Sequence, residues 1–170
     1  MRGDFPENGS RRCDTAAETK QLGHELGAAL EAGDVVILDG PLGAGKTTFT
    51  QGIADGMGVS GRVTSPTFVI AREHRSRDGG PSLVHVDAYR LIGEGSSGDP
   101  LGELDALDLE TDLDTAVVVA EWGGGLVEQI ASAYLKVTID RETLVAQDPD
   151  SEGRLIFWEI RVPEQWRCRI

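Results

Sequence analysis

Basic residues and cysteines are scarce in this chain of 170 residues, and it has no long apolar run. Lysine and arginine together number 16 against 29 acidic residues, which gives a net charge of −13. An acidic surface does not neutralise nucleic-acid phosphates, so extensive direct contact with RNA or DNA is disfavoured. If nucleic acid enters the biology of this protein, we expect a partner to hold it.

The few cysteines and the short apolar runs exclude further classes of protein. Cys13 and Cys168 lie near opposite ends of the chain and match no metal-ligand spacing, which favours two free thiols in a reducing compartment. The start of the sequence lacks the apolar core of a signal peptide. No apolar run approaches the roughly 20 residues that span a bilayer. We therefore expect a cytoplasmic protein with no membrane partner.

Glycine, in contrast, is abundant, and several glycines belong to one motif. Residues 40–47, Gly-Pro-Leu-Gly-Ala-Gly-Lys-Thr, match the P-loop pattern G-x-x-x-x-G-K-[ST]. The preceding run 35–38 is continuously apolar, as in a buried strand, and residues 46–56 have a helical pattern. Because strand, loop and helix follow in this order, the first amides of the helix can bind a polyphosphate. The sequence therefore predicts a nucleoside triphosphate site.

The geometry of such a loop assigns roles to its residues. Main-chain amides surround the β-phosphate, Lys46 reaches the β- and γ-phosphates, and the Thr47 hydroxyl binds Mg²⁺. Guanine-reading proteins use an Asn-Lys-x-Asp element, and the only asparagine here is Asn8, so ATP is the expected nucleotide. The expected nucleotide-binding positions of the loop are Gly40, Gly43, Ala44, Gly45, Lys46, Thr47 and Thr48.

Two carboxylates follow apolar runs and are the candidate catalytic and metal-binding acids. Residues 83–87 end an apolar strand with Asp87, which is the arrangement of a Walker-B acid. Glu121 follows the apolar run 117–120, and ligands of open α/β sheets bind at the carboxyl ends of the strands. We expect Asp87 on the Mg²⁺ shell. The residue types leave open whether Glu121 binds Mg²⁺ or polarises the attacking water.

Other positions are compatible with two interpretations each. Thr67 lies in a loop where switch segments sense the γ-phosphate, although a structural turn is the alternative. His85 is expected on the polar face of its strand. Trp122 can pack near the nucleotide, or else in the core or against a partner protein. Three arginines form either a solvated hairpin tip or a kinase-like lid, namely Arg72, Arg75 and Arg77.

The order of elements predicts the fold class. Residues 1–13 are polar and are interpreted as a disordered tail, and residues 14–170 as a single P-loop ATPase domain. The expected strands are 35–39, 68–73, 83–88, 117–120, 135–139 and 155–162, and the expected helices are 15–31, 46–56, 101–107 and 126–133. This alternation favours an α/β fold, a P-loop NTPase-like three-layer sandwich with a mostly parallel sheet and an antiparallel C-terminal strand pair.

Four motifs in a fixed order resemble one known family. Over about residues 14–162 the chain resembles the TsaE family, formerly YjeE, through residues 40–50, 64–68, 85–91 and 121–122. The resemblance implies a cytoplasmic ATPase of bacterial tRNA threonylcarbamoyladenosine biosynthesis. It further implies weak Mg²⁺-dependent activity alone, stimulation by the partner proteins TsaB and TsaD, and contact with tRNA only through those partners.

The resemblance also implies roles for single residues. It places the start of the first helix, near Thr15, against the nucleotide and puts the segment 65–67, with Thr67, in a nucleotide-sensing loop. It places Asp87 and Glu121 around the metal and the water. Gly123–Gly125 departs from the family, which often has proline after Glu-Trp. The alternatives are a P-loop kinase for a small molecule and a non-catalytic module gated by nucleotide.

Overall fold

The computed structural model of the chain describes residues 1–41, 43–64, 71–87, 114–121 and 131–163. The elements within these residues are, in chain order, β1 Asn8–Cys13, α1 Ala16–Ala29, β2 Val35–Asp39, α2 Lys46–Met57, β3 Ala71–His74, β4 Ser82–Asp87, β5 Ala116–Glu121, β6 Tyr134–Asp140, α7 Glu142–Gln147 and β7 Arg154–Arg161.

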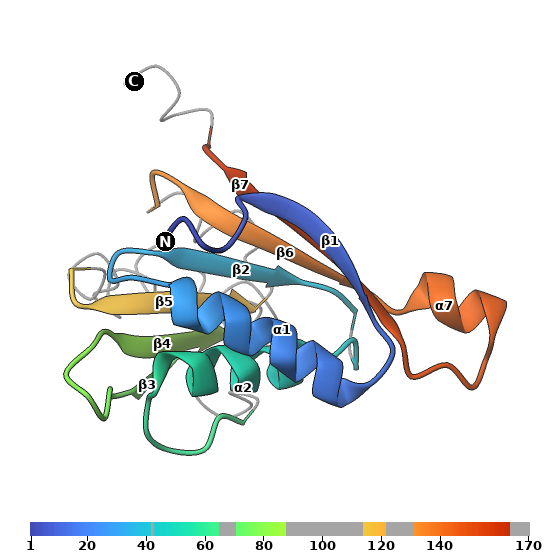
Figure 1. The fold of residues 1–170 in the computed structure, drawn as a ribbon, viewed down its shortest axis with the longest axis horizontal. Coiled ribbons are helices and arrows are strands. Elements are labelled where there is room, and N and C mark those ends of the chain that lie inside the picture. The colour runs from blue at the N-terminus through green and yellow to red at the C-terminus, as the bar shows by residue number, and fades with distance from the viewer. Residues whose placement is uncertain (42, 65–70, 88–113, 122–130, 164–170) are drawn as a thin grey trace, which may run out of the picture.

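The described strands form one sheet in the order β1-β7-β6-β2-β5-β4-β3 (Figure 1). β2 pairs in parallel with β5 and with β6, and β4 pairs in parallel with β5. β3 joins one end of the sheet antiparallel to β4, and β7 and β1 extend the other end with antiparallel pairs. The predicted α/β fold with a mostly parallel sheet and an antiparallel C-terminal pair, β6 with β7, is confirmed.

The central strands are apolar because both of their faces are buried. Every residue of β5 is buried, and so is β2 from Val35 to Leu38. Alternate side chains belong to two separate clusters: Val119 packs with residues of α1 and α2, and Val118 packs with residues on the opposite face. Since β2, β4 and β5 run in one direction, their last residues, Asp39, Asp87 and Glu121, lie at the same edge of the sheet.

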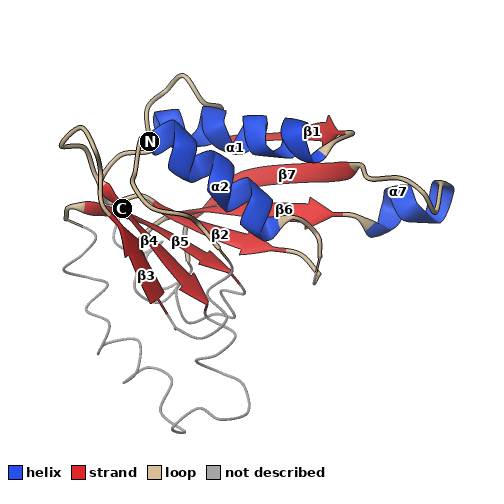
Figure 2. Ribbon diagram, turned by 90° about the horizontal axis from the view of Figure 1, so that it is seen from below, coloured by secondary structure: helices blue, strands red, loops and turns tan. Residues whose placement is uncertain are grey.

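Helices α1 and α2 lie side by side over one face of the sheet (Figures 1 and 2). Their backbones touch at glycines. A Cβ atom on Gly27 would stand 2.2 Å from the carbonyl oxygen of Ile53, and one on Gly52 would stand 2.1 Å from that of Lys20. The small residues therefore set the close approach of the two helices, which in turn holds the start of α2 over the sheet edge.

The prediction of a disordered tail over residues 1–13 is wrong. Asn8–Cys13 form β1, which pairs with β7 along its whole length. Phe5 is buried, and its ring centroid lies 5.3 Å from that of Trp158. The polar composition of this segment did not indicate a strand, because an edge strand is held by main-chain hydrogen bonds and its side chains can be polar and exposed. Most residues of β1 are of this kind.

Two further elements differ from the expectation or lie beyond it. The loop expected between β6 and β7 contains the short helix α7, which projects beyond the edge where β2 and β6 end (Figure 1). The helix expected over 101–107 lies outside the described residues, as does 126–130 of the helix expected over 126–133. Residues 131–133 are not helical. None of the described helices is long and apolar enough to cross a membrane.

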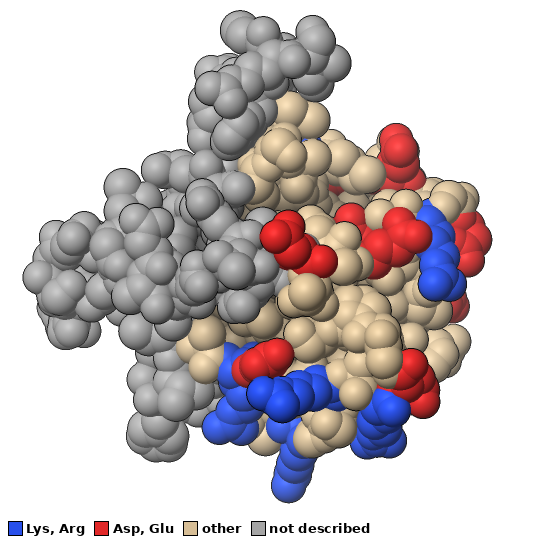
Figure 3. Space-filling model, turned by 90° about the vertical axis from the view of Figure 1, so that its left-hand side faces the viewer, with Lys and Arg blue, Asp and Glu red and all other residues tan. Residues whose placement is uncertain are grey.

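Charge is unevenly distributed over the surface. On the face shown in Figure 3, basic side chains gather along one border and acidic side chains are spread over the rest. The exposed residues of β3 and the turn after it include Arg72, Arg75 and Arg77. With 29 acidic residues against 16 basic ones, such local groups of arginine are exceptions on an acidic molecule.

Candidate functional site

The loop between β2 and α2 has the backbone shape of an anion site. Gly43 and Gly45 have φ angles of 76° and 104°, left-handed values that residues with a Cβ atom rarely adopt. The amide of Ala44 donates to the carbonyl of Pro41 at 3.0 Å, which tightens the turn. Gly45 is the N-cap of α2 and, having no side chain, makes no side-chain cap hydrogen bond. The cap residue therefore has no side chain that competes with an anion for the first amides of α2.

Lys46, the first residue of α2, points back into this loop. Its side chain is only 6% exposed, and Nζ donates to the carbonyl oxygen of Gly40 at 2.7 Å and to that of Pro41 at 3.0 Å. Gly40 is required for a different reason than the other glycines, because a Cβ atom there would stand 2.8 Å from the carbonyl oxygen of Ile139 in β6. The loop thus holds its ammonium group close to its own main chain.

The two expected acids lie next to each other beside this ammonium group. Asp87 and Glu121 are directly paired in the register of β4 and β5, and Glu121 is also paired with Leu38 of β2. Burial lowers the pKa of Lys46, and three neighbouring carboxylates oppose that shift. These are, in order of effect, Glu121, Asp39 and Asp87. The strand ends therefore gather negative charge around the lysine of the loop.

His85 is not on a polar surface as expected, and that prediction is wrong. Its ring is fully buried, and Nε2 lies 3.1 Å from Oε1 of Glu121, which is itself only 5% exposed. Within a strand, residues two apart share a face, so His85 and Asp87 both face the side of the sheet covered by α2. The β4 strand is buried on both of its faces, which leaves no polar face for His85 to occupy.

A cavity of about 260 Å³ lies beside the P-loop. It is bounded by the starts of α1 and α2 and by the chain between β6 and β7. Its lining residues are Ala16, Thr19, Gly45, Thr48, Arg141, Ser151, Glu152 and Arg154. The structure therefore brings the first turn of α1, through Ala16 and Thr19, to the same hollow as Thr48.

The remaining predicted site residues have different positions. Thr47 is partly buried in the first turn of α2. Thr15 is the N-cap of α1, and its Oγ1 accepts a hydrogen bond from the amide of Glu18 at 3.2 Å. Thr15 is not among the lining residues of the cavity, although its neighbour Ala16 is. Thr67 and Trp122 lie outside the described residues.

Arg154 is a part of the site that the sequence did not suggest. Its Nε donates to the carbonyl oxygen of Ala44 at 2.6 Å, and Nη2 donates to that of Gly43 at 3.4 Å. Burial lowers the pKa of Arg154, and the positive charge of Arg141 lowers it further. No sequence signal marks an arginine at the start of a C-terminal strand as a contact of the P-loop, since only the pairing of β6 with β7 brings it there.

Two of the three arginines considered as a lid, Arg75 and Arg77, lie away from the strand ends described above, whereas Arg72 lies within β3 and is paired with His85 of β4. The β3–β4 turn joins the end of β3 to the start of β4, whereas Asp87 ends β4. Arg75 and Arg77 in this turn are therefore at the opposite edge of the sheet from the P-loop. Both are exposed. For Arg75 and Arg77, the solvated hairpin tip is the interpretation that fits this topology.

The donor set fits Mg²⁺ held together with a polyphosphate. Within the described ranges, no group of three or more His, Cys, Asp or Glu side chains could hold a metal ion. Mg²⁺ usually takes one or two carboxylates, with waters and phosphate oxygens as the other ligands. The paired Asp87 and Glu121, with the hydroxyl of Thr47 on the neighbouring helix, supply a set of that size.

Comparisons with known proteins agree with this architecture. The model of the family described as threonylcarbamoyl adenosine biosynthesis protein TsaE matches residues 13–148. The tRNA threonylcarbamoyladenosine biosynthesis protein TsaE of Mycobacterium bovis is 52% identical over 158 residues, which are 92% of this chain and 90% of that protein. The protein of the same name from Bacillus subtilis is 40% identical over 124 residues, covering 73% of this chain and 72% of the relative.

A solved structure extends the likeness to three dimensions. The crystal structure of Bacillus subtilis YdiB matches with a TM-score of 0.66 and 29% sequence identity, and the match covers 96% of this chain and 92% of that one. Both the P-loop and the paired acids lie within the part of the chain that the family model matches. The chain belongs to the TsaE family of proteins that take part in tRNA threonylcarbamoyladenosine biosynthesis.

Proposed function

We propose that this protein is a Mg²⁺-dependent ATPase that serves tRNA threonylcarbamoyladenosine modification in the cytoplasm through the proteins TsaB and TsaD. The observation that supports the ATPase most directly is the pairing of Asp87 with Glu121 beside Lys46. A P-loop alone binds a nucleotide, and hydrolysis in addition needs acids at the metal and the attacking water. Here both kinds of group share one sheet edge.

The residues of the loop bind and orient the phosphates. The main-chain amides of residues 43–48 surround the β-phosphate, and Lys46 exchanges its carbonyl partners for phosphate oxygens. Asp87, Glu121 and Thr47 would hold Mg²⁺, which when bound neutralises charge on the β- and γ-phosphates. If Glu121 does not bind the metal, its carboxylate instead orients the attacking water.

The cavity beside the loop is the place for the rest of the nucleotide. Thr48 follows the residues that contact the β- and γ-phosphates, so the hollow that it lines adjoins the α-phosphate side. Arg141 lines the same hollow, and one of its terminal nitrogens would be 3.5 Å from a Cβ atom placed on Gly43. A guanidinium group at that place suits an α-phosphate oxygen.

The acidic composition supports an indirect role towards tRNA. A protein with a net charge of −13 gains little from counterion release on RNA, so TsaB and TsaD would hold the substrate. A P-loop kinase is less well supported, because Arg75 and Arg77 of the lid suggested by the sequence lie in a turn at the far edge of the sheet from the P-loop. A non-catalytic module remains distinguishable from an ATPase by experiment.

The decisive experiment measures ATP hydrolysis and ATP affinity on the same variants, alone and with TsaB and TsaD. We expect slow hydrolysis by the protein alone and faster hydrolysis with both partners. Lys46→Ala should lose ATP binding, whereas Glu121→Gln should bind ATP and not turn it over. Lys20→Ala, which removes a surface lysine paired with Asp55, is the control. Hydrolysis that Glu121→Gln leaves intact would contradict the catalytic role of these acids.

The same experiment separates the alternatives. If Lys46→Ala and Glu121→Gln lose ATP affinity equally, Glu121 serves chiefly as a metal ligand. Hydrolysis that the partners do not change, together with phosphorylation of a small acceptor, would favour the kinase. Binding of ATP with no turnover under any condition would favour the nucleotide-gated module.

A further inference from the structure

A fully buried histidine lies directly behind the proposed catalytic edge. His85 is 0% exposed and is among the largest fully buried side chains of the described residues, where its companions are leucines, isoleucines and phenylalanine. Histidine rarely fills a position in an apolar core unless its ring nitrogens form hydrogen bonds or bind a ligand, because burying them without a partner costs free energy. The P-loop roles described above make no use of this residue.

The strand register explains why His85 reaches Glu121. His85 on β4 is paired with Val119 on β5, and Glu121 is two residues further along β5. The two side chains are thus diagonal neighbours on one face, within reach of long side chains. Nε2 of His85 lies 3.1 Å from Oε1 of Glu121. Asp87, in contrast, is directly opposite Glu121.

The chemistry of the pair defines its donor and acceptor. A carboxylate only accepts, so the ring nitrogen that faces Oε1 must carry the proton and donate. The other ring nitrogen of His85, Nδ1, is buried and has no hydrogen-bond partner among the described residues. Nδ1 of His85 is thus buried without a hydrogen bond to any described residue, whereas Nε2 is hydrogen-bonded to Glu121. The bond to Glu121 is the only hydrogen bond that the buried ring makes within the described residues.

We propose that His85 is the positioning residue of Glu121: its Nε2–H holds Oε1 and leaves Oε2 to face the nucleotide. This inference rests on the proposed function, because it assigns a supporting partner to the acid of that site. His85 touches neither nucleotide nor metal. It fixes the orientation of the carboxylate that does, as buried hydrogen bonds commonly do for acids at metal and catalytic sites.

Removing such a supporting contact typically costs about 10- to 100-fold in activity or metal affinity. We expect His85→Leu to lower kcat by a factor in that range and to change the ATP dissociation constant less than about threefold, because the P-loop contacts remain. The decrease in kcat should not be accompanied by a decrease in the free energy of unfolding. Leucine fills an apolar site and removes the unsatisfied Nδ1, so the folded state should be retained.

Two polar variants test whether the hydrogen bond from Nε2 matters, rather than the volume of the His85 side chain. The amide of glutamine can replace Nε2 of histidine, whereas the shorter asparagine places its amide near Nδ1. We expect His85→Gln to recover most of kcat and His85→Asn to remain as impaired as His85→Leu. His74→Leu is the matched control, since His74 is also buried and contacts the carbonyl of Ser60 rather than Glu121.

The experiment measures kcat for ATP hydrolysis at saturating ATP and Mg²⁺, the ATP dissociation constant, thermal unfolding and a crystal structure of each variant without nucleotide. A Glu121 carboxylate that rotates in His85→Leu and His85→Asn, but not in His85→Gln, supports the proposal. Equal kcat in the three variants, or losses matched by His74→Leu, would overturn it.

If Glu121→Gln retains hydrolysis, the proposed function fails. If Glu121→Gln is inactive and His85→Leu is fully active, only the present inference fails. Should His85→Leu not fold, the contrast between His85→Gln and His85→Asn decides the matter.

Discussion

Arg154 donates a hydrogen bond to the carbonyl oxygen of Ala44 at 2.6 Å, across 110 residues of sequence. The same guanidinium also contacts the carbonyls of Glu152 and Gly153, each at 2.9 Å. One arginine at the start of β7 therefore ties the C-terminal part of the sheet to the middle of the P-loop. A planar group with several fixed donors suits this task better than a lysine ammonium would.

The tie between Arg154 and the loop should be measurable as nucleotide affinity. We expect Arg154→Ala to weaken ATP binding by about tenfold, since a hydrogen bond from a charged group contributes about 1.5–3 kcal/mol and 1.4 kcal/mol is a factor of ten. Titration calorimetry with ATP and Mg²⁺ measures the change. Arg161→Ala, at the other end of β7 and paired with Glu159, is the control. Equal affinity of the two variants would show that the loop holds its shape without Arg154.

The contact between α1 and α2 should not tolerate a methyl group. Gly27→Ala would place a Cβ atom 2.2 Å from the carbonyl oxygen of Ile53. Alanine gains up to about 1 kcal/mol of helix propensity, but the clash is with main chain and overpacking costs about 1–3 kcal/mol. We expect a net loss in the free energy of unfolding, measured by urea denaturation. Gly3→Ala, with no atom within 4 Å of the added Cβ, should leave stability unchanged, and an equally stable Gly27→Ala would refute the argument.

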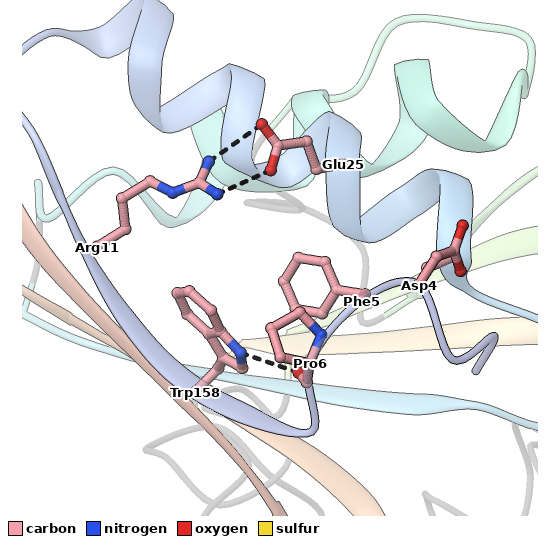
Figure 4. Close-up of a pocket in the computed structure, with 7 residues that line it drawn as sticks. Asp4, Phe5, Pro6, Arg11, Glu25 and Trp158 are labelled. Atoms are coloured by element: carbon pink, nitrogen blue, oxygen red, sulfur yellow. Dashed lines mark hydrogen bonds and ion pairs between the residues drawn. The ribbon is translucent and has the colours of Figure 1, made fainter.

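The N-terminal segment should contribute to stability although it is polar. Phe5, Pro6 and Trp158 line a cavity of about 340 Å³ that also carries the Arg11–Glu25 ion pair (Figure 4). The indole Nε1 of Trp158 donates to the carbonyl of Pro6 at 3.0 Å. We expect Phe5→Ala to cost about 3 kcal/mol in the free energy of unfolding, as removal of a buried phenylalanine ring usually does.

The neighbouring strand provides the control for Phe5. Phe157 is 45% exposed, and Phe157→Ala should change the free energy of unfolding by less than about 0.5 kcal/mol. Thermal unfolding of both variants makes the comparison. If Phe5→Ala is as stable as Phe157→Ala, the segment before β1 adds nothing to the folded state.

Stability should fall as the pH decreases below neutrality, in part through His74. Burial lowers the pKa of His74, the hydrogen bond to the carbonyl of Ser60 opposes the shift, and the charges of His85 and Arg72 lower it further. The unfolded chain, with the ordinary value of 6.5, binds the proton more readily. The contribution of this residue is therefore complete above about pH 6.5, begins to decrease below that value and is lost as the pH falls through the lowered pKa of the folded protein.

The variant His74→Gln isolates this contribution. We expect its midpoint of thermal unfolding to drop less between pH 7.5 and pH 5.5 than that of the unaltered protein, because no buried ring has to be protonated. Nε2 of His74 has no hydrogen-bond partner among the described residues, so a proton there would be unpaired. The same pH dependence in both proteins would show that other groups account for it.

The P-loop and the paired acids could be anticipated from sequence because their signals are local. Residues 40–47 contain the glycines at which the chain turns with positive φ. Asp87 and Glu121 each follow an apolar run typical of a buried strand, and this pattern predicts acids at the strand ends. Parallel strands then bring both acids to one edge by topology alone. The start of α1 was equally readable, since Thr15 and Glu18 form a cap within a few residues.

The missed features share a dependence on pairing between distant strands. β1 is stable because its main chain pairs with that of β7 along its whole length. Nothing in the polar side chains of β1 indicates this pairing. His85 looked like a residue of a polar face, and burial on both sides of β4 changed its role. Short-range patterns report what a segment prefers, whereas the environment of a side chain is set by its neighbours in space.

Residues close in sequence were thus enough to specify a loop with the P-loop pattern, the two acids at neighbouring strand ends and the α/β class. The dihedral preferences of glycine and the period of apolar residues act over a few positions and need no distant partner. Tertiary structure alone decided that Arg154 holds Ala44, that His85 holds Glu121 and that the N-terminal segment completes the sheet. Each of these contacts joins segments at least 36 residues apart, and only the order of strands in the folded sheet brings them together.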